Sequence, residues 1–406
     1  MSKKYALYKY PPFSAGKKKT KRNQGYTVDK LNEVIDPSYF SIEFQKHCFD
    51  YPFTPPILPL FKRIIVMGDI HGDYELTMTM FSLANLIKIN KSTNKIQWIG
   101  EDTVVVQVGD QIDRCRPIGN MTCDLPNTTY KDESSDIKLL KLFTDLDIQA
   151  RKANGMVISL LGNHELLNAE GNLTYVSYKN IEEFKDYKDP KNPNKRFSSG
   201  NEARVYAFRP GNEYAKFLGC TRLPAVIIGN LLFVHAGIID RLIRELKINK
   251  SSDLNTINIA IKKWLLGLIS KEYVDKIISA NKYSMFWNRI LGQIPPNINL
   301  EDDMCIKHID ETLKLFNVGH IIIGHTPQSF LYSSGINGTC IDHINNTKKI
   351  IKSDVGSSNA FGPFDEEQMR TNINNPNRDP QILEIINGNI FNIIKKTKNG
   401  IVTKKL

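Results

Sequence analysis

The chain of 406 residues, 41% of them hydrophobic, is long enough for one large elaborated domain or two domains around a sizeable core. No apolar run reaches the ~18 residues that a membrane-spanning helix needs, so the sequence gives no indication of membrane insertion. No hydrophobic segment of the kind found in secretory signals follows the first residues either. We therefore expect a cytoplasmic or otherwise intracellular protein.

The net charge of +11 comes from 54 basic and 43 acidic residues, with basic clusters at residues 17–22, 395–396 and 404–405. These clusters are typical of solvated terminal arms. A nucleic-acid partner stays open but unsupported, because no aromatic-interleaved basic stripe or nucleic-acid-binding motif accompanies them. The six cysteines have no CxxC spacing, which favours a reduced protein over a disulfide scaffold and argues against a structural zinc site.

In chain order, residues 1–58 form a Lys- and Pro-rich extension that we expect to be partly disordered near its start. Residues 59–364 then contain five short apolar runs rich in β-branched residues, each predicted to be a buried strand. The runs are residues 63–67, 103–108, 156–161, 231–234 and 320–323. Helix-compatible segments at residues 74–89 and 136–153 alternate with the first three runs, which is the pattern of an α/β sheet.

Two later segments differ from this alternation. Between residues 238 and 290, Leu, Ile and Trp264 recur at helical spacing, which predicts a small helical cap inserted in the domain. Residues 365–406 alternate apolar and polar side chains around Asn387-Gly388 and Asn399-Gly400, a pattern typical of β-hairpins. We expect these C-terminal strands and a basic tail to follow the main domain.

A short polar motif closes each of the five predicted strands. The motifs are GDIHG at residues 68–72, GDQIDR at 109–114, GNHE at 162–165, HAG at 235–237 and GHT at 324–326. Because ligands collect at the carboxyl ends of strands in α/β sheets, we expect these motifs to converge. Their carboxylate, amide and imidazole groups are the ligands that two divalent cations need in a phosphoesterase site.

Spacing within the motifs suggests a role for each side chain. Asp69 and His71, two residues apart on one loop, can turn toward one cation, and Asp110 can bridge two cations about 3.5–4 Å apart. Such a pair lowers the pKa of a bound water and supplies hydroxide for attack on phosphorus. The predicted metal ligands are Asp69, His71, Asp110, Asn163, His235 and His325.

Two further residues, His164 and Arg114, are predicted to act on the substrate, and two others to support the site. His164 is expected to protonate the leaving group, with Asp113 orienting its ring and favouring its protonated form. The planar guanidinium of Arg114 suits bidentate contact with phosphoryl oxygens. Glu165 is expected to support the site through a hydrogen bond behind the ligands. Taken singly, such residues are more often helix caps or ordinary core side chains, so the combination carries the prediction.

The five motifs together resemble the calcineurin-like metallophosphoesterases, and the Asp-Arg at residues 113–114 with GNHE resembles their phosphoprotein phosphatase branch. The segment LLGNHELLNAEGNLTYV at 160–176, GHTPQ at 324–328 and Asp354-Val355-Gly356 are similar to the Shewanella-like protein phosphatases. The resemblance covers roughly residues 60–362. It implies an α/β fold in which two sheets form a sandwich flanked by helices.

By this resemblance, Asp110 is shared between two divalent cations, which would be manganese, iron or zinc. The first cation takes Asp69, His71 and Asp110, and the second takes Asp110, Asn163, His235 and His325. Phosphate binding in the family implies Arg114 and Asn163 with a second arginine. Arg289 is the stronger candidate for that arginine, and Arg204 is the next.

The sequence departs from the family pattern at two points that bear on the substrate. Cys115 stands where the family usually has glycine after Asp-Arg, and the Ser-Ala-Pro-Asn-Tyr segment of eukaryotic Ser/Thr phosphatases is absent. We therefore expect a metal-dependent phosphomonoesterase acting on phosphorylated protein, or on another phosphomonoester, with Ser/Thr and Tyr both open. The alternatives are a diadenosine-polyphosphate or nucleotide hydrolase and a non-catalytic metal-binding scaffold.

Overall fold

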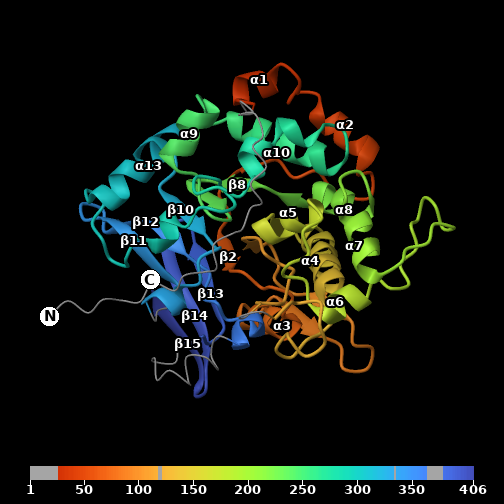
Figure 1. Ribbon diagram of the computed structural model, residues 1–406. Helices are drawn as coiled ribbons and strands as arrows, with labels where there is room; N and C mark the ends of the chain where they lie inside the picture. Colours follow the sequence, from red (N-terminus) through yellow and green to blue (C-terminus); the bar gives the residue numbers. More distant parts are fainter. Residues whose placement is uncertain (1–25, 118–120, 333–334, 364–377) are drawn as a thin grey trace.

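The computed structural model describes residues 26–117, 121–332, 335–363 and 378–406. Two sheets lie at its centre (Figure 1). The seven-stranded sheet has the order β15-β14-β13-β2-β5-β6-β7, with β2 Arg63–Met67, β5 Val104–Gln107, β6 Met156–Leu160, β7 Arg222–Leu223, β13 Gln381–Ile386, β14 Ile390–Thr397 and β15 Gly400–Lys405. The six-stranded sheet has the order β1-β8-β9-β10-β12-β11, with β1 Ile57–Leu58, β8 Ala225–Ile228, β9 Leu231–Val234, β10 His320–Ile323, β11 Asn337–Asp342 and β12 Thr347–Lys352.

Side-chain alternation along the strands explains how the two sheets pack. On β2, Ile64 and Val66 face the other sheet and join a core cluster that includes Phe233 of β9. Ile65 and Met67, which alternate with them along the strand, face the opposite side and pack in a separate cluster. Because successive strand residues point to opposite faces, β2 is buried on both, which matches its apolar run at residues 64–67. The predicted α/β two-sheet sandwich is confirmed.

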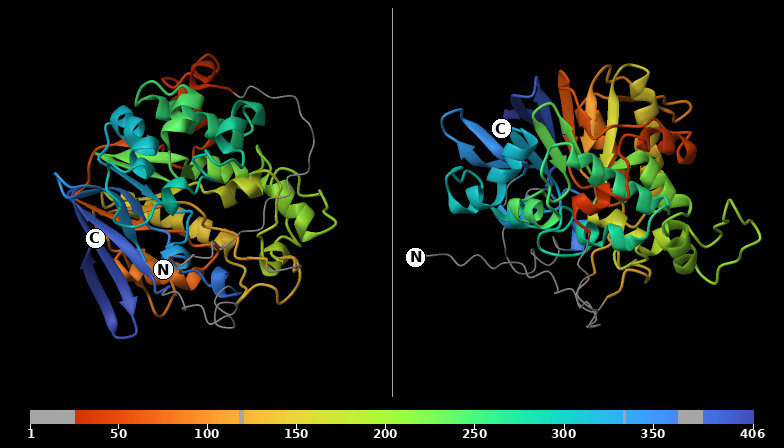
Figure 2. Two further views of the ribbon diagram at one scale, coloured as in Figure 1. Left: turned by 60° about the vertical axis from the view of Figure 1, so that its left-hand side comes forward. Right: turned by 90° about the horizontal axis from the view of Figure 1, so that it is seen from above.

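Helices cover the outer faces of the sandwich (Figures 1 and 2). On the seven-stranded sheet these are α3 Tyr74–Leu83 and α4 Asp136–Arg151, which share a cluster with β2 and β5. The six-stranded sheet carries the predicted helical cap, with α9 Asp240–Leu246, α10 Asp253–Leu265, α11 Asp275–Ile278 and α12 Ile290–Gln293, next to α13 Asp303–Phe316. Further elements are α5 Asn163–Ala169, α6 Tyr178–Glu182, α7 Gly200–Phe208, α8 Glu213–Thr221, α14 Gln328–Tyr332 and the hairpin of β3 Ile87–Ile89 and β4 Ile96–Trp98.

The segment before the first central strand is part of the folded core from residue 28 onward. Helix α1 Val28–Asn32 buries Val28 and Leu31, and α2 Phe40–His47 buries Phe40 and Phe44, in the cluster beneath the cap. Residues 1–25, where the basic run lies, are outside the described residues. The predicted boundary at residue 58 therefore lies inside the folded core, because Phe40 and Phe44 contribute apolar area to that core.

The C-terminal strands are likewise integral to the sandwich. Strand β13 pairs antiparallel with β2 in the middle of the seven-stranded sheet, with Glu384 opposite Ile65. The predicted hairpins are confirmed, with turns at Asn387-Gly388 between β13 and β14 and at Asn399 between β14 and β15. In Figure 2 the last hairpin extends beyond the body of the sheet.

All six cysteines are paired, so the expectation of a reduced protein is wrong. The disulfides are Cys48–Cys220, Cys115–Cys123 and Cys305–Cys340. The first joins residues 172 positions apart in the sequence, a pairing that only the fold reveals. The cysteine pattern therefore no longer supports an intracellular location. Within the described ranges, no helix combines the length and apolar character that a membrane crossing requires.

Candidate active site

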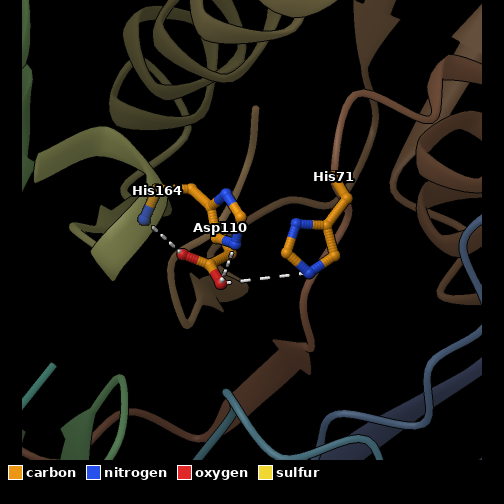
Figure 3. Close-up of side chains that lie close together, drawn as sticks. All are labelled: His71, Asp110 and His164. Carbon is orange, nitrogen blue, oxygen red and sulfur yellow. Dashed lines mark hydrogen bonds and ion pairs between the residues drawn. The ribbon is translucent and has the colours of Figure 1, made fainter. Parts of the chain in front are cut away.

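The five motifs come together at the carboxyl ends of β2, β5, β6, β9 and β10. In the seven-stranded sheet β2, β5 and β6 run parallel to one another, and in the six-stranded sheet β9 and β10 run parallel. The loop after each strand therefore reaches the same edge of the sandwich. Figure 3 shows His71, Asp110 and His164 converging there, with the Asp110 carboxylate between the two imidazoles. The expected convergence of the motif residues is what the structure shows.

Asp110 lies at the centre of the site. Its Oδ2 is 3.3 Å from Nε2 of His235, 3.8 Å from Nε2 of His164 and 3.9 Å from Nε2 of His71. Two groups of three residues, each with ligand atoms mutually within 4.8 Å, share this carboxylate. They are His71, Asp110 and His164, and Asp110, His235 and His325.

The other predicted ligands complete this arrangement. Asp69 Oδ2 lies 4.0 Å from Nε2 of His71, and Asn163 Oδ1 lies 3.0 Å from Nε2 of His235. A buried carboxylate, Asp354, stands behind them, and its Oδ2 has no hydrogen-bond partner among the described residues. Buried carboxylates, imidazoles and an amide oxygen, with one acidic oxygen left unsatisfied, are a donor set that fits divalent cations.

The electrostatics of the two central carboxylates differ. Burial alone would raise the pKa of Asp110, but the imidazoles of His235 and His164 hold that pKa well below its ordinary value. The pKa of Asp69 is instead raised well above its ordinary value by burial and by the nearby carboxylates of Asp354 and Asp110. This concentration of negative charge is what a bound cation would neutralise.

The backbone around the ligands is strained. His71, Asp110, Asp113 and His325 all have positive φ, at 48°, 54°, 72° and 65°. For residues other than glycine this region is sparsely populated and persists where surrounding contacts enforce it, as at functional sites. One such contact comes from Glu165, which binds the backbone N–H of Asp110.

Glu165 ties the loops after β5 and β6 together. Its carboxylate accepts hydrogen bonds from the backbone N–H groups of Asp110, Gln111 and Gly162, at 3.0, 2.8 and 2.7 Å. A carboxylate that accepts several backbone hydrogen bonds fixes the turn that carries the shared ligand. Its expected supporting role agrees with this geometry.

His164 and Asp113 form the predicted pair. Nδ1 of His164 lies 2.9 Å from Oδ2 of Asp113, and Asn168 donates to the other Asp113 oxygen at 2.9 Å. The His164 ring also lines a cavity at the site, whose lining includes the predicted metal ligands His71, Asp110, Asn163 and His325. His164 therefore has one ring nitrogen held from behind and presents the other to the cavity, which suits proton transfer to a leaving group.

The structure separates the three predicted arginines. Arg289 lines the cavity, and its Nη1 donates to the backbone oxygen of His325 at 2.7 Å. Arg114 does not line it, because its Nη1 donates to Gly72 and Glu133. Arg204 is fully buried against Asp136, 2.8 Å away, and supports Asp113 from behind at 3.7 Å. Of the three, only Arg289 meets the metal ligands at this cavity.

Sequence reasoning missed Arg116 and the aromatic wall of the cavity. Arg116 lines the cavity together with Tyr175, Trp287 and Phe361. The signal available in the sequence was a second arginine two residues after the Asp-Arg motif. Tyr175 stood inside the segment that carried the resemblance, but nothing in the sequence placed it near Phe361.

Comparison with known proteins supports the same assignment. The profile of the family described as calcineurin-like phosphoesterase matches residues 62–329, well over half of the chain. The chain belongs to the calcineurin-like phosphoesterases. The predicted family membership is thus confirmed, and the protein is a metal-dependent phosphoesterase.

Individual relatives place this phosphoesterase near the Shewanella-like phosphatases. It is 27% identical over 325 residues to Shewanella-like protein phosphatase 2 of Arabidopsis thaliana, covering 73% of this chain and 72% of that protein. It is 38% identical over 258 residues to the uncharacterized protein R398 of Acanthamoeba polyphaga mimivirus, covering 62% of this chain and 96% of that protein. The crystal structure of a cold-active protein-tyrosine phosphatase of a psychrophilic Shewanella species shares the fold, with a TM-score of 0.57, 20% identity and coverage of 87% and 83%.

Proposed function

We propose that this phosphoesterase is a phosphoprotein phosphatase that holds two divalent cations, manganese, iron or zinc, at the shared carboxylate. The observation that carries the proposal is the Asp110 carboxylate, which belongs to both groups of candidate ligands. The names of the relatives from Arabidopsis thaliana and Plasmodium berghei, both Shewanella-like protein phosphatases, support a phosphorylated protein as substrate.

One cation would be held by His71 and Asp110 with Asp69, whose Oδ2 is 4.0 Å from Nε2 of His71. The other would be held by Asp110, His235 and His325 with Asn163. When bound, such cations supply positive charge that polarises phosphoryl oxygens and acidifies water. The site is lined by buried residues, so these interactions operate away from bulk solvent, where charges interact more strongly.

The protein's own residues account for the rest of the reaction. His164 delivers a proton to the departing oxygen of the substrate, and Asp113 keeps the ring in the orientation that allows it. Arg289, beside His325 at the cavity wall, offers guanidinium donors to phosphoryl oxygens. The aromatic side chains of Tyr175, Trp287 and Phe361 give the cavity mouth apolar surface for a peptide side chain.

The experiment is a turnover panel with the manganese-loaded protein. It compares p-nitrophenyl phosphate, phosphotyrosine and phosphothreonine peptides, and diadenosine tetraphosphate, in the unmodified protein and in His164→Ala. Turnover of the peptides that is lost in the variant supports the proposal and ranks the amino-acid preference. Turnover of the dinucleotide alone reassigns the protein to nucleotide hydrolysis. Absence of turnover with manganese, iron and zinc in turn contradicts the enzyme assignment.

A further inference from the structure

We propose that Arg116, in place of Arg114, is the arginine that binds the substrate phosphoryl group on the His71 side of the cavity. The inference rests on the proposed phosphatase function and names a binding residue for it. Arg114, which belongs to the motif, and Arg116, which does not, lie two residues apart. The structure gives their guanidinium groups different surroundings.

Arg114 is buried outside the cavity lining, with its Nη1 bonded to the protein and its Nε buried without a hydrogen-bond partner among the described residues. Its Nη1 donates to the backbone oxygen of Gly72 and to Oε1 of Glu133, both at 2.8 Å, and lies 3.8 Å from Asp73. Its exposed fraction is 2%, and it is absent from the cavity lining. To reach a phosphoryl group, Arg114 would have to give up its hydrogen bonds to the half-exposed Glu133 carboxylate and to the Gly72 carbonyl, which costs the energy of both interactions.

Arg116 is held in place but keeps donors for a ligand. Its Nη1 donates to the backbone oxygens of Asp113, at 3.1 Å, and Cys115, at 2.8 Å. No hydrogen bond to a described residue engages its Nε or Nη2. Because the guanidinium has five N–H donors in a rigid plane, fixing one nitrogen leaves a fork that suits two phosphoryl oxygens.

Two aromatic rings set the plane of this guanidinium. The central carbon of Arg116 lies 4.9 Å from the ring centre of Phe361 and 5.6 Å from that of Tyr175. All three side chains line the cavity together with His71 and His164. Cation–π contact at these distances holds a guanidinium without using its hydrogen-bond donors. The side chain is therefore pre-organised before the substrate arrives.

The loop that carries Arg116 is anchored at Cys115, the residue between the two arginines. The Cys115 backbone N–H donates to the backbone oxygen of Tyr175 at 3.0 Å, and the Cys115–Cys123 disulfide ties the same residue to the following loop. These anchors keep Arg116 beside the rings of the cavity wall.

Arg116 has a counterpart across the cavity. Arg289 donates to the backbone oxygen of His325 at 2.7 Å, and the Phe361 ring that contacts Arg116 has its centre 5.5 Å from that of the His71 ring. Each arginine thus lies near one of the two groups of candidate metal ligands. A phosphoryl group that spans both groups would meet a guanidinium at either end, which is the arrangement that stabilises charge spread over its oxygens.

The test measures equilibrium binding of inorganic phosphate to the manganese-loaded protein by calorimetry, because binding needs no turnover. Arg116→Ala is expected to raise the Kd for phosphate about 10- to 100-fold, as loss of a charge-assisted contact does. Arg116→Lys keeps the charge but loses the fork, so an intermediate increase is expected. Arg244→Ala, at an exposed position with a surface partner in Glu311, removes one positive charge elsewhere and should change the Kd less than 2-fold.

Arg114→Lys provides the direct comparison. It should lower the melting temperature, because Glu133 and Gly72 lose their planar partner, while the Kd for phosphate changes less than 3-fold. Metal content and melting temperature are measured for every variant. If Arg116→Ala does not fold, Arg116→Lys decides the question at full metal content.

The inference is overturned if both folded Arg116 variants bind phosphate as the unmodified protein does, or if only Arg114→Lys weakens binding. It is also overturned if the unmodified, metal-loaded protein binds no phosphate. Failure of the phosphatase proposal looks different: phosphate binds and depends on Arg116, yet no phosphorylated peptide is hydrolysed. Conversely, peptides could be hydrolysed while neither the KM nor the phosphate affinity changes in the Arg116 variants. That result would support the phosphatase function and contradict the role of Arg116.

Discussion

Nδ1 of His164 lies 2.9 Å from Oδ2 of Asp113, while Nε2 of the same ring lies 3.8 Å from the carboxylate shared by both candidate metal groups. The ring is therefore held from behind by one carboxylate and faces another across the cavity. Asn168 fixes Asp113 in turn, donating to its Oδ1 at 2.9 Å. A histidine oriented this firmly is suited to proton transfer, and the role can be tested through the leaving group.

The first prediction concerns His164→Gln. The substitution should lower kcat about 10²- to 10⁴-fold on a phosphothreonine peptide, whose alkoxide leaves poorly without a proton. The loss should be at least tenfold smaller on p-nitrophenyl phosphate, whose leaving group needs little protonation. Asp113→Asn should lower kcat by about 10- to 100-fold, the effect of losing a group that orients its neighbour. Steady-state kinetics on both substrates measures these losses.

Metal content serves as the control for that experiment, because His164 also belongs to one candidate ligand group. Equal losses on the two substrates, together with loss of metal, would show that His164 acts as a ligand and would contradict the acid role.

The second prediction concerns metal stoichiometry. Asp110 belongs to both groups and His325 to one, so Asp110→Asn should abolish tight binding of both cations and His325→Ala of one. Metal analysis after equilibration with manganese and gel filtration measures this directly. Removing the cations with a chelator should lower the melting temperature, because a ligand at 100 times its Kd stabilises the folded state by about 2.7 kcal/mol. Equal manganese content in the two variants would contradict a shared carboxylate.

The third prediction concerns Gly324, which closes the strand before His325. A Cβ at this position would lie 2.2 Å from Oδ1 of Asp69 and 2.8 Å from Cγ2 of Val108. Gly324→Ala should therefore displace a metal ligand and weaken manganese binding at least tenfold, measured by calorimetry. Gly319→Ala is the matched control at the other end of the same strand, where the nearest atom is the Asn230 side-chain amide at 3.2 Å. Unchanged affinity in Gly324→Ala would show that the strand shifts without moving Asp69.

The sequence predicted most of the strands that position the site, and there is a physical reason for this. The runs at residues 63–67, 231–234 and 320–323 coincide with β2, β9 and β10. After the first residues of β2 and β10, Arg63 and His320, each strand is apolar because it is buried on both faces, and the polar residue that follows marks its end. Local sequence and tertiary environment agree at these positions, which makes the ligand loops easy to locate.

The arginines could not be assigned in the same way. Arg114 and Arg116 are chemically identical and two residues apart, and only the tertiary partners Glu133 and Phe361 distinguish them. The cysteines present the same difficulty, since Cys48 and Cys220 meet only after residues far apart in sequence have packed under the cap. Long-range partners leave no trace in local periodicity, so such contacts escape a prediction from one sequence.

The fourth prediction separates two of the disulfides. Cys48–Cys220 joins residues 172 positions apart, and Cys115–Cys123 joins residues 8 apart. Chain-entropy arguments give about 5 kcal/mol for removing the long link and about 2.5 kcal/mol for the short one. The double variant Cys48→Ser/Cys220→Ser should thus lose more free energy of unfolding in urea than Cys115→Ser/Cys123→Ser.

The effect on activity should be larger for the short-link variant than for the long-link variant. Cys115 precedes Arg116 at the cavity wall, whereas Cys48 lies under the cap. The short-link variant is expected to raise KM for p-nitrophenyl phosphate while the long-link variant leaves it unchanged at temperatures where both are folded. Titration of free thiols in the unfolded parent protein verifies that the bonds are present. Detection of six free thiols there would remove the basis of this prediction.

The fifth prediction uses the buried ammonium of Lys262 on α10. Its Nζ donates to the backbone oxygens of Gly219, at 2.9 Å, and Arg222, at 2.7 Å. Burial, and then the charge of Arg222, lowers the pKa of Lys262 from 10.5 to about 7. Between these two values the unfolded chain binds a proton that the folded protein does not, so the free energy of unfolding rises with pH, by at most about 1.4 kcal/mol per pH unit.

Lys262→Met lacks this titration. The difference in unfolding free energy between the unmodified protein and Lys262→Met should therefore grow in favour of the unmodified protein as pH rises from 7 to 9, measured by urea unfolding at each pH. Lys307→Met, at a side chain 64% exposed, is the control and should show no such trend. A difference that stays flat or shrinks over this range would mean that Lys262 keeps its proton in the fold, held by the two carbonyls strongly enough to offset its burial.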